Sequence, residues 1–98
     1  MEELIAIKNS SADFQLIDVR EREEWNLGYI EGALHIPQQQ IFSGQALDLI
    51  SKQRPVALYC HSGIRSANCT QALLDQGFTQ VVSVAGGIQA WDLYSHHV

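Results

Sequence analysis

The segment that most constrains this chain runs from Val56 to Gly77, where an apolar run, a cysteine and a helical segment follow one another. Val56-Ala57-Leu58-Tyr59 is a short apolar run typical of a buried strand, and Cys60 ends it. Ser66 to Gln76 then predicts a helix, closed by Gly77 just after its C-cap. Ligands of a parallel α/β sheet bind outside the carboxyl ends of the strands. The sequence therefore predicts that Cys60 lies at a ligand-binding edge.

The loop Cys60-His61-Ser62-Gly63-Ile64-Arg65-Ser66 has features that stabilise a thiolate. Backbone N–H groups of the loop and the start of the following helix favour negative charge, and Arg65 adds a positive charge. Gly63 permits a positive φ, which lets loop amides turn inward. We therefore expect the pKa of Cys60 to lie below the free value of about 8.5. The alternative is a structural cysteine, since free cysteine is often buried.

Strand-like and helix-like segments alternate along the chain, which predicts a single α/β domain over residues 1–98. We expect a central parallel sheet of about five short strands with helices on both faces. The strands that the pattern places are Phe14 to Val19, Ala33 to Ile36, Val56 to Tyr59 and Gln80 to Val84. The helices are Glu21 to Trp25, a segment from Ile41 or Ser43 to Lys52, Ser66 to Gln76, and Ile88 to Tyr94. Glu2 to Lys8 is a lead-in or a helix turn, and no repeat or linker follows it.

Composition excludes several classes of function. The chain has 98 residues, of which 46% are hydrophobic and 17% charged, as in ordinary soluble domains. The net charge of −5, without a basic cluster, argues against nucleic acid as a partner. No run approaches the roughly 18 apolar residues of a membrane span, and the acidic start lacks signal-peptide features, so we expect a cytoplasmic protein.

Neither the cysteines nor the histidines predict a metal site. Cys60 and Cys69 form no zinc-binding pattern. His96 and His97 are adjacent, but they belong to a tail that we expect to be frayed and solvated. We therefore predict no metal and no cofactor.

Four segments resemble, in the same order, the signatures of the single-domain rhodaneses, a family of sulfurtransferases. They are Leu16 to Arg20, Gly28 to Pro37, Cys60 to Ser66 and Gly86 to Trp91. The resemblance covers nearly the whole chain and implies a single rhodanese-like domain. One departure is Tyr29, where the family commonly has histidine.

The resemblance implies that Cys60 carries a sulfane sulfur as a persulfide, by covalent catalysis. A small anionic donor such as thiosulfate supplies the sulfur, and a thiol, cyanide or a redox protein accepts it. Arg65 is the candidate for holding the donor's anionic group. Ser66 caps the helix or donates to the bound sulfur. The residues that shape the loop mouth are His61 and Ser62, with Ile64 either packed inward or in contact with substrate.

Asp18 and Arg20 close the first strand with opposite charges. We expect a local ion pair that fastens the end of the strand to its neighbours, which is the usual role of a buried pair. By resemblance, both residues also lie close to the Cys60 loop and support it.

Three other interpretations stay open. Cysteine-dependent phosphatases and arsenate reductases also combine a cysteine, loop amides and an arginine, but with five intervening residues where Cys60 and Arg65 have four. A non-catalytic rhodanese-like binding module typically loses the cysteine, which this chain keeps. Cys69 is either a small buried hydrophobe or a resolving thiol for the Cys60 persulfide.

Overall fold

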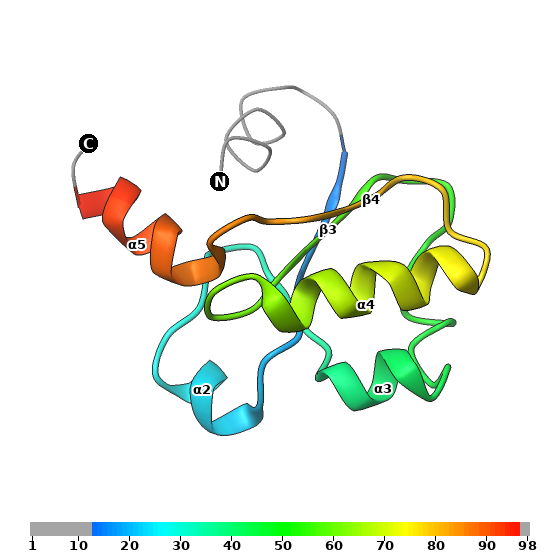
Figure 1. The fold of residues 1–98 in the computed structure, drawn as a ribbon, viewed down its shortest axis with the longest axis horizontal. Helices are drawn as coiled ribbons and strands as arrows, with labels where there is room; N and C mark the ends of the chain where they lie inside the picture. The colour runs from blue at the N-terminus through cyan, green and yellow to red at the C-terminus, as the bar shows by residue number, and fades with distance from the viewer. Residues whose placement is uncertain (1–12, 97–98) are drawn as a thin grey trace.

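The structure is a computed structural model that describes residues 13–96. It is an α/β domain in which each strand is followed by a helix or a short connection (Figure 1). In chain order the elements are β1 (Gln15–Asp18), α2 (Arg22–Asn26), β2 (Leu34–His35), α3 (Gln38–Phe42), β3 (Val56–Tyr59), α4 (Ile64–Asp75), β4 (Val81–Ser83) and α5 (Gly87–His96).

All strand pairs of the described sheet are parallel, and the strand order is β2-β1-β3-β4. The described residues form a sheet of four strands rather than the predicted five or so. The lead-in segment Glu2 to Lys8 lies outside the described residues. Because the strands are parallel, their carboxyl ends meet at one edge, which gathers Asp18, His35, Cys60 and Ser83 there.

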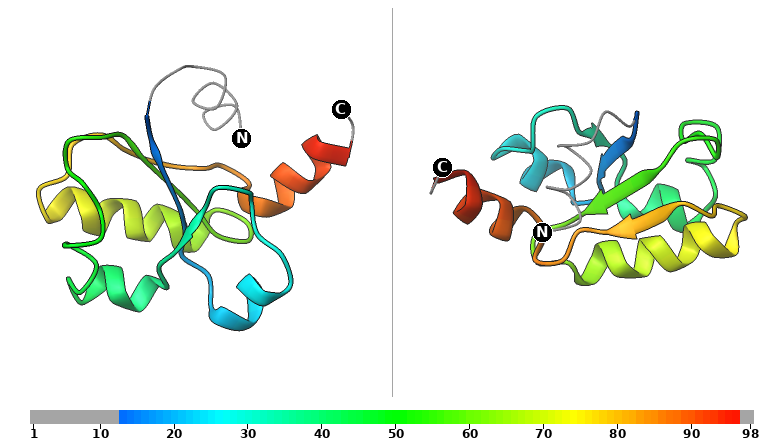
Figure 2. Two further views of the ribbon diagram at one scale, coloured as in Figure 1. Left: turned by 180° about the vertical axis from the view of Figure 1, so that it is seen from behind. Right: turned by 90° about the horizontal axis from the view of Figure 1, so that it is seen from above.

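The residues of β3 alternate between two hydrophobic clusters, as side chains along a strand must. Leu58 and Cys60 join a cluster with residues of α3 and α4, whereas Ala57 and Tyr59 join one with Ile88 of α5. Helices therefore cover both faces, as predicted. Figures 1 and 2 show α4 running along β3 and β4, with α5 near the edge where Cys60 emerges.

The helix predicted between residues 41 or 43 and Lys52 is wrong. Helix α3 begins at Gln38, directly after Pro37, and ends at Phe42. The helix ends because Gly44, which follows the C-cap Ser43, has φ 82°, and its amide bonds the Ile41 carbonyl at 3.2 Å, as in a glycine C-terminal cap.

The residues after α3 form a series of turns. Ala46 and Ile50 are buried, but Leu47 and Leu49 are 40% and 56% exposed. The four apolar residues therefore do not share the single helical face that their spacing predicted.

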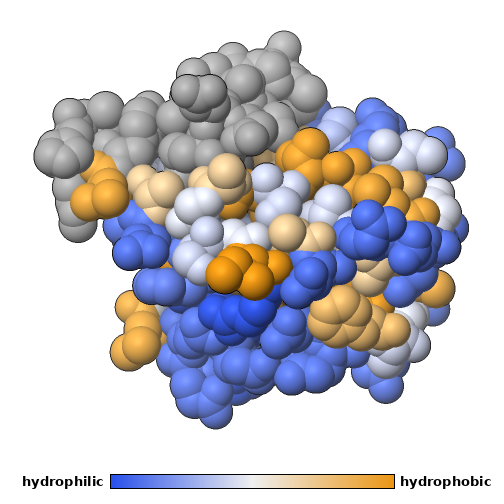
Figure 3. Space-filling view, viewed as in Figure 1, coloured by the Kyte–Doolittle hydropathy of each residue, from blue (hydrophilic) through white to orange (hydrophobic). Residues whose placement is uncertain are grey.

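The other helices lie close to their predicted positions. Helix α4 starts two residues earlier than expected, and Gly77 follows its C-cap Gln76, as predicted. Helix α5 continues through His96, which was expected to belong to a frayed tail, and His97 lies outside the described residues. Helix α2 buries none of its residues, and the surface over it is hydrophilic (Figure 3). Within residues 13–96, no helix is both long and apolar enough to span a bilayer.

Candidate active site

The Cys60 sulfur lies in a ring of hydrogen-bond donors formed by its own loop. The Gly63 amide donates to Sγ at 3.1 Å, and the Ser66 amide lies 3.4 Å from it. The Ser66 hydroxyl is a further 3.6 Å contact. Cys60 itself is only 1% exposed, so water contributes little to the stabilisation of its charge.

These contacts lower the pKa of Cys60 below its ordinary value. Burial is the largest single influence and acts to raise it. Hydrogen bonds that the Cys60 sulfur makes with the amide and hydroxyl of Ser66, and with the amides of Gly63 and Ser62, together outweigh burial. The expectation of a stabilised thiolate at Cys60 is therefore met by the geometry, and its principal donors are backbone amides.

The loop takes this shape because two glycines permit it. Gly63 has φ 110°, a region that side chains disfavour, and a Cβ there would lie 3.3 Å from the Gly86 amide nitrogen. At Gly87 a Cβ would collide with the carbonyl oxygen of Cys60. That close approach allows the Ile88 amide to donate to the Cys60 carbonyl at 2.9 Å, so the start of α5 is bonded to the base of the loop.

Ser66 connects the loop to the end of β4. It is fully buried, and its hydroxyl lies 3.2 Å from the Gly63 carbonyl and 2.7 Å from the Ser83 hydroxyl. Sequence reasoning did not select Ser83. The available signal was a polar residue within the apolar run Val81 to Val84, at the edge of the sheet that carries Cys60.

Arg65 forms a bidentate ion pair with Glu24 of α2, with N–O distances of 2.7 and 2.8 Å. The pair lowers the pKa of Glu24 to about 2, chiefly through the Arg65 hydrogen bonds, and raises the pKa of Arg65. Glu24 was expected only as a member of the short helix Glu21 to Trp25. Since 41 positions separate the two residues, no local pattern could predict the contact.

Asp18 and Arg20 form the predicted ion pair, and it is buried. Arg20 Nη2 lies 2.7 Å from the Asp18 carboxylate, and Arg20 Nε donates at 3.0 Å. Nη2 also donates to the Gly28 carbonyl at 2.6 Å, which ties the end of β1 to the segment after α2. Tyr59 supports the same segment, because its buried hydroxyl accepts from the Ile30 amide at 3.0 Å.

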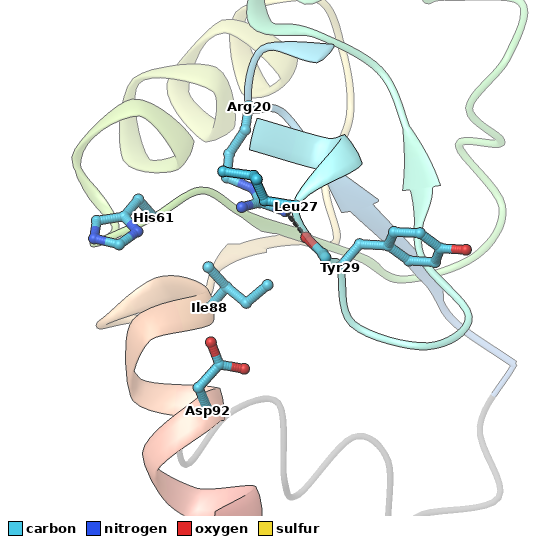
Figure 4. Close-up of a pocket in the computed structure, with 7 residues that line it drawn as sticks. Arg20, Leu27, Tyr29, His61, Ile88 and Asp92 are labelled. Carbon is cyan, nitrogen blue, oxygen red and sulfur yellow. Dashed lines mark hydrogen bonds between the residues drawn. The ribbon is translucent and has the colours of Figure 1, made fainter. Parts of the chain in front are cut away.

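A cavity of about 350 Å³ opens beside the Cys60 loop (Figure 4). Its lining comes from the end of β1, the segment after α2, the loop and the first turns of α5: Arg20, Leu27, Gly28, Tyr29, His61, Ile88 and Asp92. Of the predicted site residues, His61 and Arg20 reach this cavity. The others of that lining were not predicted, since they become neighbours only through the fold.

The side chains of three loop residues lie at the surface. His61 and Ser62 are exposed, and Ile64 is 73% exposed, so its side chain does not fold inward. Within the described part of the chain, no cluster of three or more metal-binding side chains is present.

Cys69 lies inside α4, away from the loop amides. It is fully buried in the cluster that includes Leu73 and Phe78. Burial, and secondarily the nearby Cys60 charge, raise its pKa to about 11. A neutral thiol in an apolar cluster matches the prediction of a small buried hydrophobe.

A parallel sheet that delivers a cysteine into a ring of amides defines a cysteine-dependent α/β domain, and comparisons with known proteins identify its family. The rhodanese-like domain family matches residues 1–93, so the chain belongs to the rhodanese-like family.

Among its relatives, the chain is 41% identical over 83 residues to the probable adenylyltransferase/sulfurtransferase MoeZ of Mycobacterium tuberculosis, covering 85% of this chain but only 21% of MoeZ. It is 38% identical over 79 residues to the thiosulfate sulfurtransferase GlpE of Shewanella oneidensis, covering 79% of this chain and 74% of GlpE. The solved structure of the human single-domain sulfurtransferase TSTD1 is similar at a TM-score of 0.74 and 30% identity, covering 93% of this chain and 90% of that one. All three of these relatives carry the name sulfurtransferase.

Proposed function

We propose that this protein transfers a sulfane sulfur from a small anionic donor such as thiosulfate to a nucleophilic acceptor, by way of a persulfide on Cys60. The observation that carries the proposal is the ring of amide donors around Sγ, from Gly63 and Ser66. The likeness to relatives named as sulfurtransferases supports it.

In the first step, the Cys60 thiolate attacks the outer sulfur of thiosulfate. The new S–S bond forms as the bond to the sulfonate group breaks, and sulfite leaves with the electron pair of that bond. The amides that stabilised the thiolate are placed to stabilise charge on the transferred sulfur, about 2 Å beyond Sγ. We assign the binding of the donor's anionic group to Arg65, the positively charged residue of the loop. The donor competes with the Glu24 carboxylate for the same guanidinium.

In the second step, a thiolate or cyanide attacks the outer sulfur of the persulfide. The electron pair of the breaking S–S bond returns to Cys60, and the thiolate is regenerated in its ring of donors. The two half-reactions give ping-pong kinetics. We place this cycle in the cytosol, where thiols are kept reduced.

The alternative chemistries fit the loop less well. A phosphatase or arsenate reductase loop surrounds a tetrahedral oxyanion, whereas four residues between Cys60 and Arg65 make a shorter loop. Two of its amides already donate to sulfur, which suits a sulfur anion. A non-catalytic binding module would have no use for a cysteine whose pKa is lowered.

Steady-state transfer from thiosulfate to cyanide, followed as thiocyanate, tests the proposal. We expect parallel lines in double-reciprocal plots for the wild type and loss of activity in Cys60→Ala. Cys69→Ala is the matched control, since it removes a buried thiol that lacks amide donors, and it should keep transfer. Turnover in Cys60→Ala, or phosphatase activity without sulfur transfer in the wild type, would refute the proposal.

A further inference from the structure

The hydroxyl of Ser66 has one proton and three polar neighbours within reach. It lies 3.6 Å from Cys60 Sγ, 3.2 Å from the Gly63 carbonyl and 2.7 Å from the Ser83 hydroxyl. A hydroxyl donates one hydrogen bond and accepts up to two, and its proton rotates to suit its neighbours. The direction of this one proton therefore decides whether Ser66 stabilises charge on the sulfur.

The charge state of Cys60 restricts the directions that the proton can take. A thiolate accepts hydrogen bonds and cannot donate one, and the Gly63 carbonyl is likewise only an acceptor. Among the described groups that contact the Ser66 hydroxyl, Ser83 is therefore the only one that can donate to it while Sγ is charged. When Ser83 donates, the Ser66 proton is free for the sulfur. When Ser66 donates to Ser83 instead, an oxygen lone pair faces the thiolate.

The Gly63 carbonyl competes for the Ser66 proton, but it already has a donor. The Ala67 amide donates to it at 3.1 Å in the first turn of α4. A hydrogen bond to a charged acceptor is about twice as strong as a neutral one, so a thiolate takes the proton in preference to this carbonyl. The 3.6 Å contact is within the hydrogen-bonding range of the larger sulfur atom.

Ser83 reaches this position because it ends β4, beside the strand that delivers Cys60 (Figure 1). Its backbone pairs with Leu58 of β3. Cys60 is 1% exposed and Ser66 is fully buried, so solvent cannot provide the hydrogen bonds that this pair needs. Ser83 is half-buried, and solvent can satisfy its own lone pairs. The arrangement leads from water through two hydroxyls to the enclosed sulfur.

We propose that Ser83 is a positioning residue for sulfur transfer: its hydroxyl donates to Ser66 Oγ and so directs the Ser66 proton to the charge on Cys60 Sγ. The inference rests on the proposed function and adds to it a residue that acts only through another side chain. Burial raises the pKa of Cys60, and the Ser66 hydroxyl is among the groups that lower it. Ser83 governs that one contribution.

The effect of Ser83 on the rate falls in the second half of the catalytic cycle. In the first half, the Cys60 thiolate attacks thiosulfate, and stabilising its charge makes it a weaker nucleophile. In the second half, Cys60 is the leaving group, and a more stable thiolate leaves faster. The oriented Ser66 proton therefore speeds the step in which the acceptor takes the outer sulfur and the electron pair of the S–S bond returns to Cys60.

The first test removes the Ser83 hydroxyl and follows the rate at which iodoacetamide labels Cys60 as a function of pH. In Ser83→Ala, we expect the rise in labelling rate to move to higher pH, because the thiolate has lost an oriented donor. Ser83→Thr keeps a hydroxyl on a residue suited to a strand and should restore the wild-type profile. Val82→Ala, a truncation on the opposite face of β4, is the matched control. Identical profiles for the wild type and Ser83→Ala would overturn the proposal.

A cycle of double variants separates positioning from a purely structural role. In a Ser66→Ala background the Ser83 hydroxyl has nothing to orient, so Ser66→Ala/Ser83→Ala should have the same labelling profile as Ser66→Ala. The other titratable groups that respond to the Cys60 charge, Arg65 and Cys69 of α4, are unchanged in every variant. A further shift of the profile in the double variant would show a structural role and overturn the assignment.

Steady-state kinetics with thiosulfate and cyanide give a second readout, since kcat/KM for each substrate of a ping-pong enzyme reports its own half-reaction. At a pH where labelling has levelled off in both proteins, we expect Ser83→Ala to lower kcat/KM for cyanide about threefold, as loss of one hydrogen bond would. The value for thiosulfate should be nearly unchanged. Equal losses for both substrates would overturn the proposal.

The two proposals fail in different ways. A wild type that takes up no sulfur from thiosulfate would refute the proposed function. The labelling profiles need no sulfur donor, so they decide on Ser83 by themselves in that case.

Discussion

Cys60 and Cys69 are chemically identical side chains, nine positions apart in the sequence and members of the same hydrophobic cluster. Both are almost fully buried, with 1% and 0% of their surfaces exposed. Yet the pKa of Cys60 is lowered, while the pKa of Cys69 is raised to about 11. Burial acts in the same direction on both thiols, so it cannot account for the difference.

The difference comes from the backbone around each sulfur. Cys60 ends a strand and is followed by a loop whose amides are free to turn toward Sγ. Cys69 lies inside α4, where backbone amides bond to carbonyls one turn earlier. A buried cysteine therefore becomes a stabilised thiolate only where the fold leaves amides unused.

The largest expected effect is the contrast in reactivity between the two thiols. At neutral pH, iodoacetamide should label Cys60 at least about a hundredfold faster than Cys69, because each unit of pKa changes the thiolate fraction about tenfold. The labelling rate of Cys60 should level off at a lower pH than that of free cysteine. Peptide mapping by mass spectrometry measures both rates, and comparable labelling of the two residues would contradict the contrast.

Substitution at Gly63 tests whether the amides produce the contrast. Gly63→Ala forces a side chain onto φ 110° and against the Gly86 amide, so the loop must shift and its donors move away from Sγ. We expect the pKa of Cys60 to rise and sulfur transfer to fall about tenfold, with a loss of stability of about 1–2 kcal/mol.

The matched control is Gly32→Ala, which imposes similar strain at φ 89° with nothing within 4 Å of the new Cβ. It should cost a comparable stability but leave the Cys60 labelling rate unchanged. Equal losses of activity in both variants would attribute the effect to instability rather than to the loop amides.

The smallest effect concerns the ion pair between Glu24 and Arg65. Both side chains are about 30% exposed (31% and 29%), so Glu24→Gln should lower the free energy of unfolding by no more than about 1 kcal/mol. Because folding lowers the pKa of Glu24 from 4.5 to about 2, this stability is present above pH 4.5 and is lost as the pH falls toward 2. Urea unfolding of both proteins across that range measures it. A difference that grows on acidification would contradict the lowered pKa of Glu24.

The parts of this account that follow from local sequence could be predicted. The strand that ends at Cys60, the helix after it and the role of Gly63 depend on neighbouring residues, and the structure places them as expected. The ion pair of Asp18 and Arg20 involves residues two positions apart and was also predicted.

The parts of the account that depend on contacts between distant residues could not be predicted from the sequence. The partner of Arg65 is Glu24, and the cavity joins residues from four separate segments. The error at α3 has a different origin: apolar spacing was followed beyond Gly44, whose positive φ of 82° ends the helix just after the C-cap Ser43.

The most direct test of the central claim is the intact mass of the protein after incubation with thiosulfate, for the wild type, Cys60→Ser and Cys69→Ser. We predict one added sulfur on the wild type and on Cys69→Ser, removed by cyanide, and none on Cys60→Ser. A sulfur adduct that persists in Cys60→Ser, or its absence from a wild type whose Cys60 is reduced, would contradict the assignment of Cys60 as the sulfur carrier.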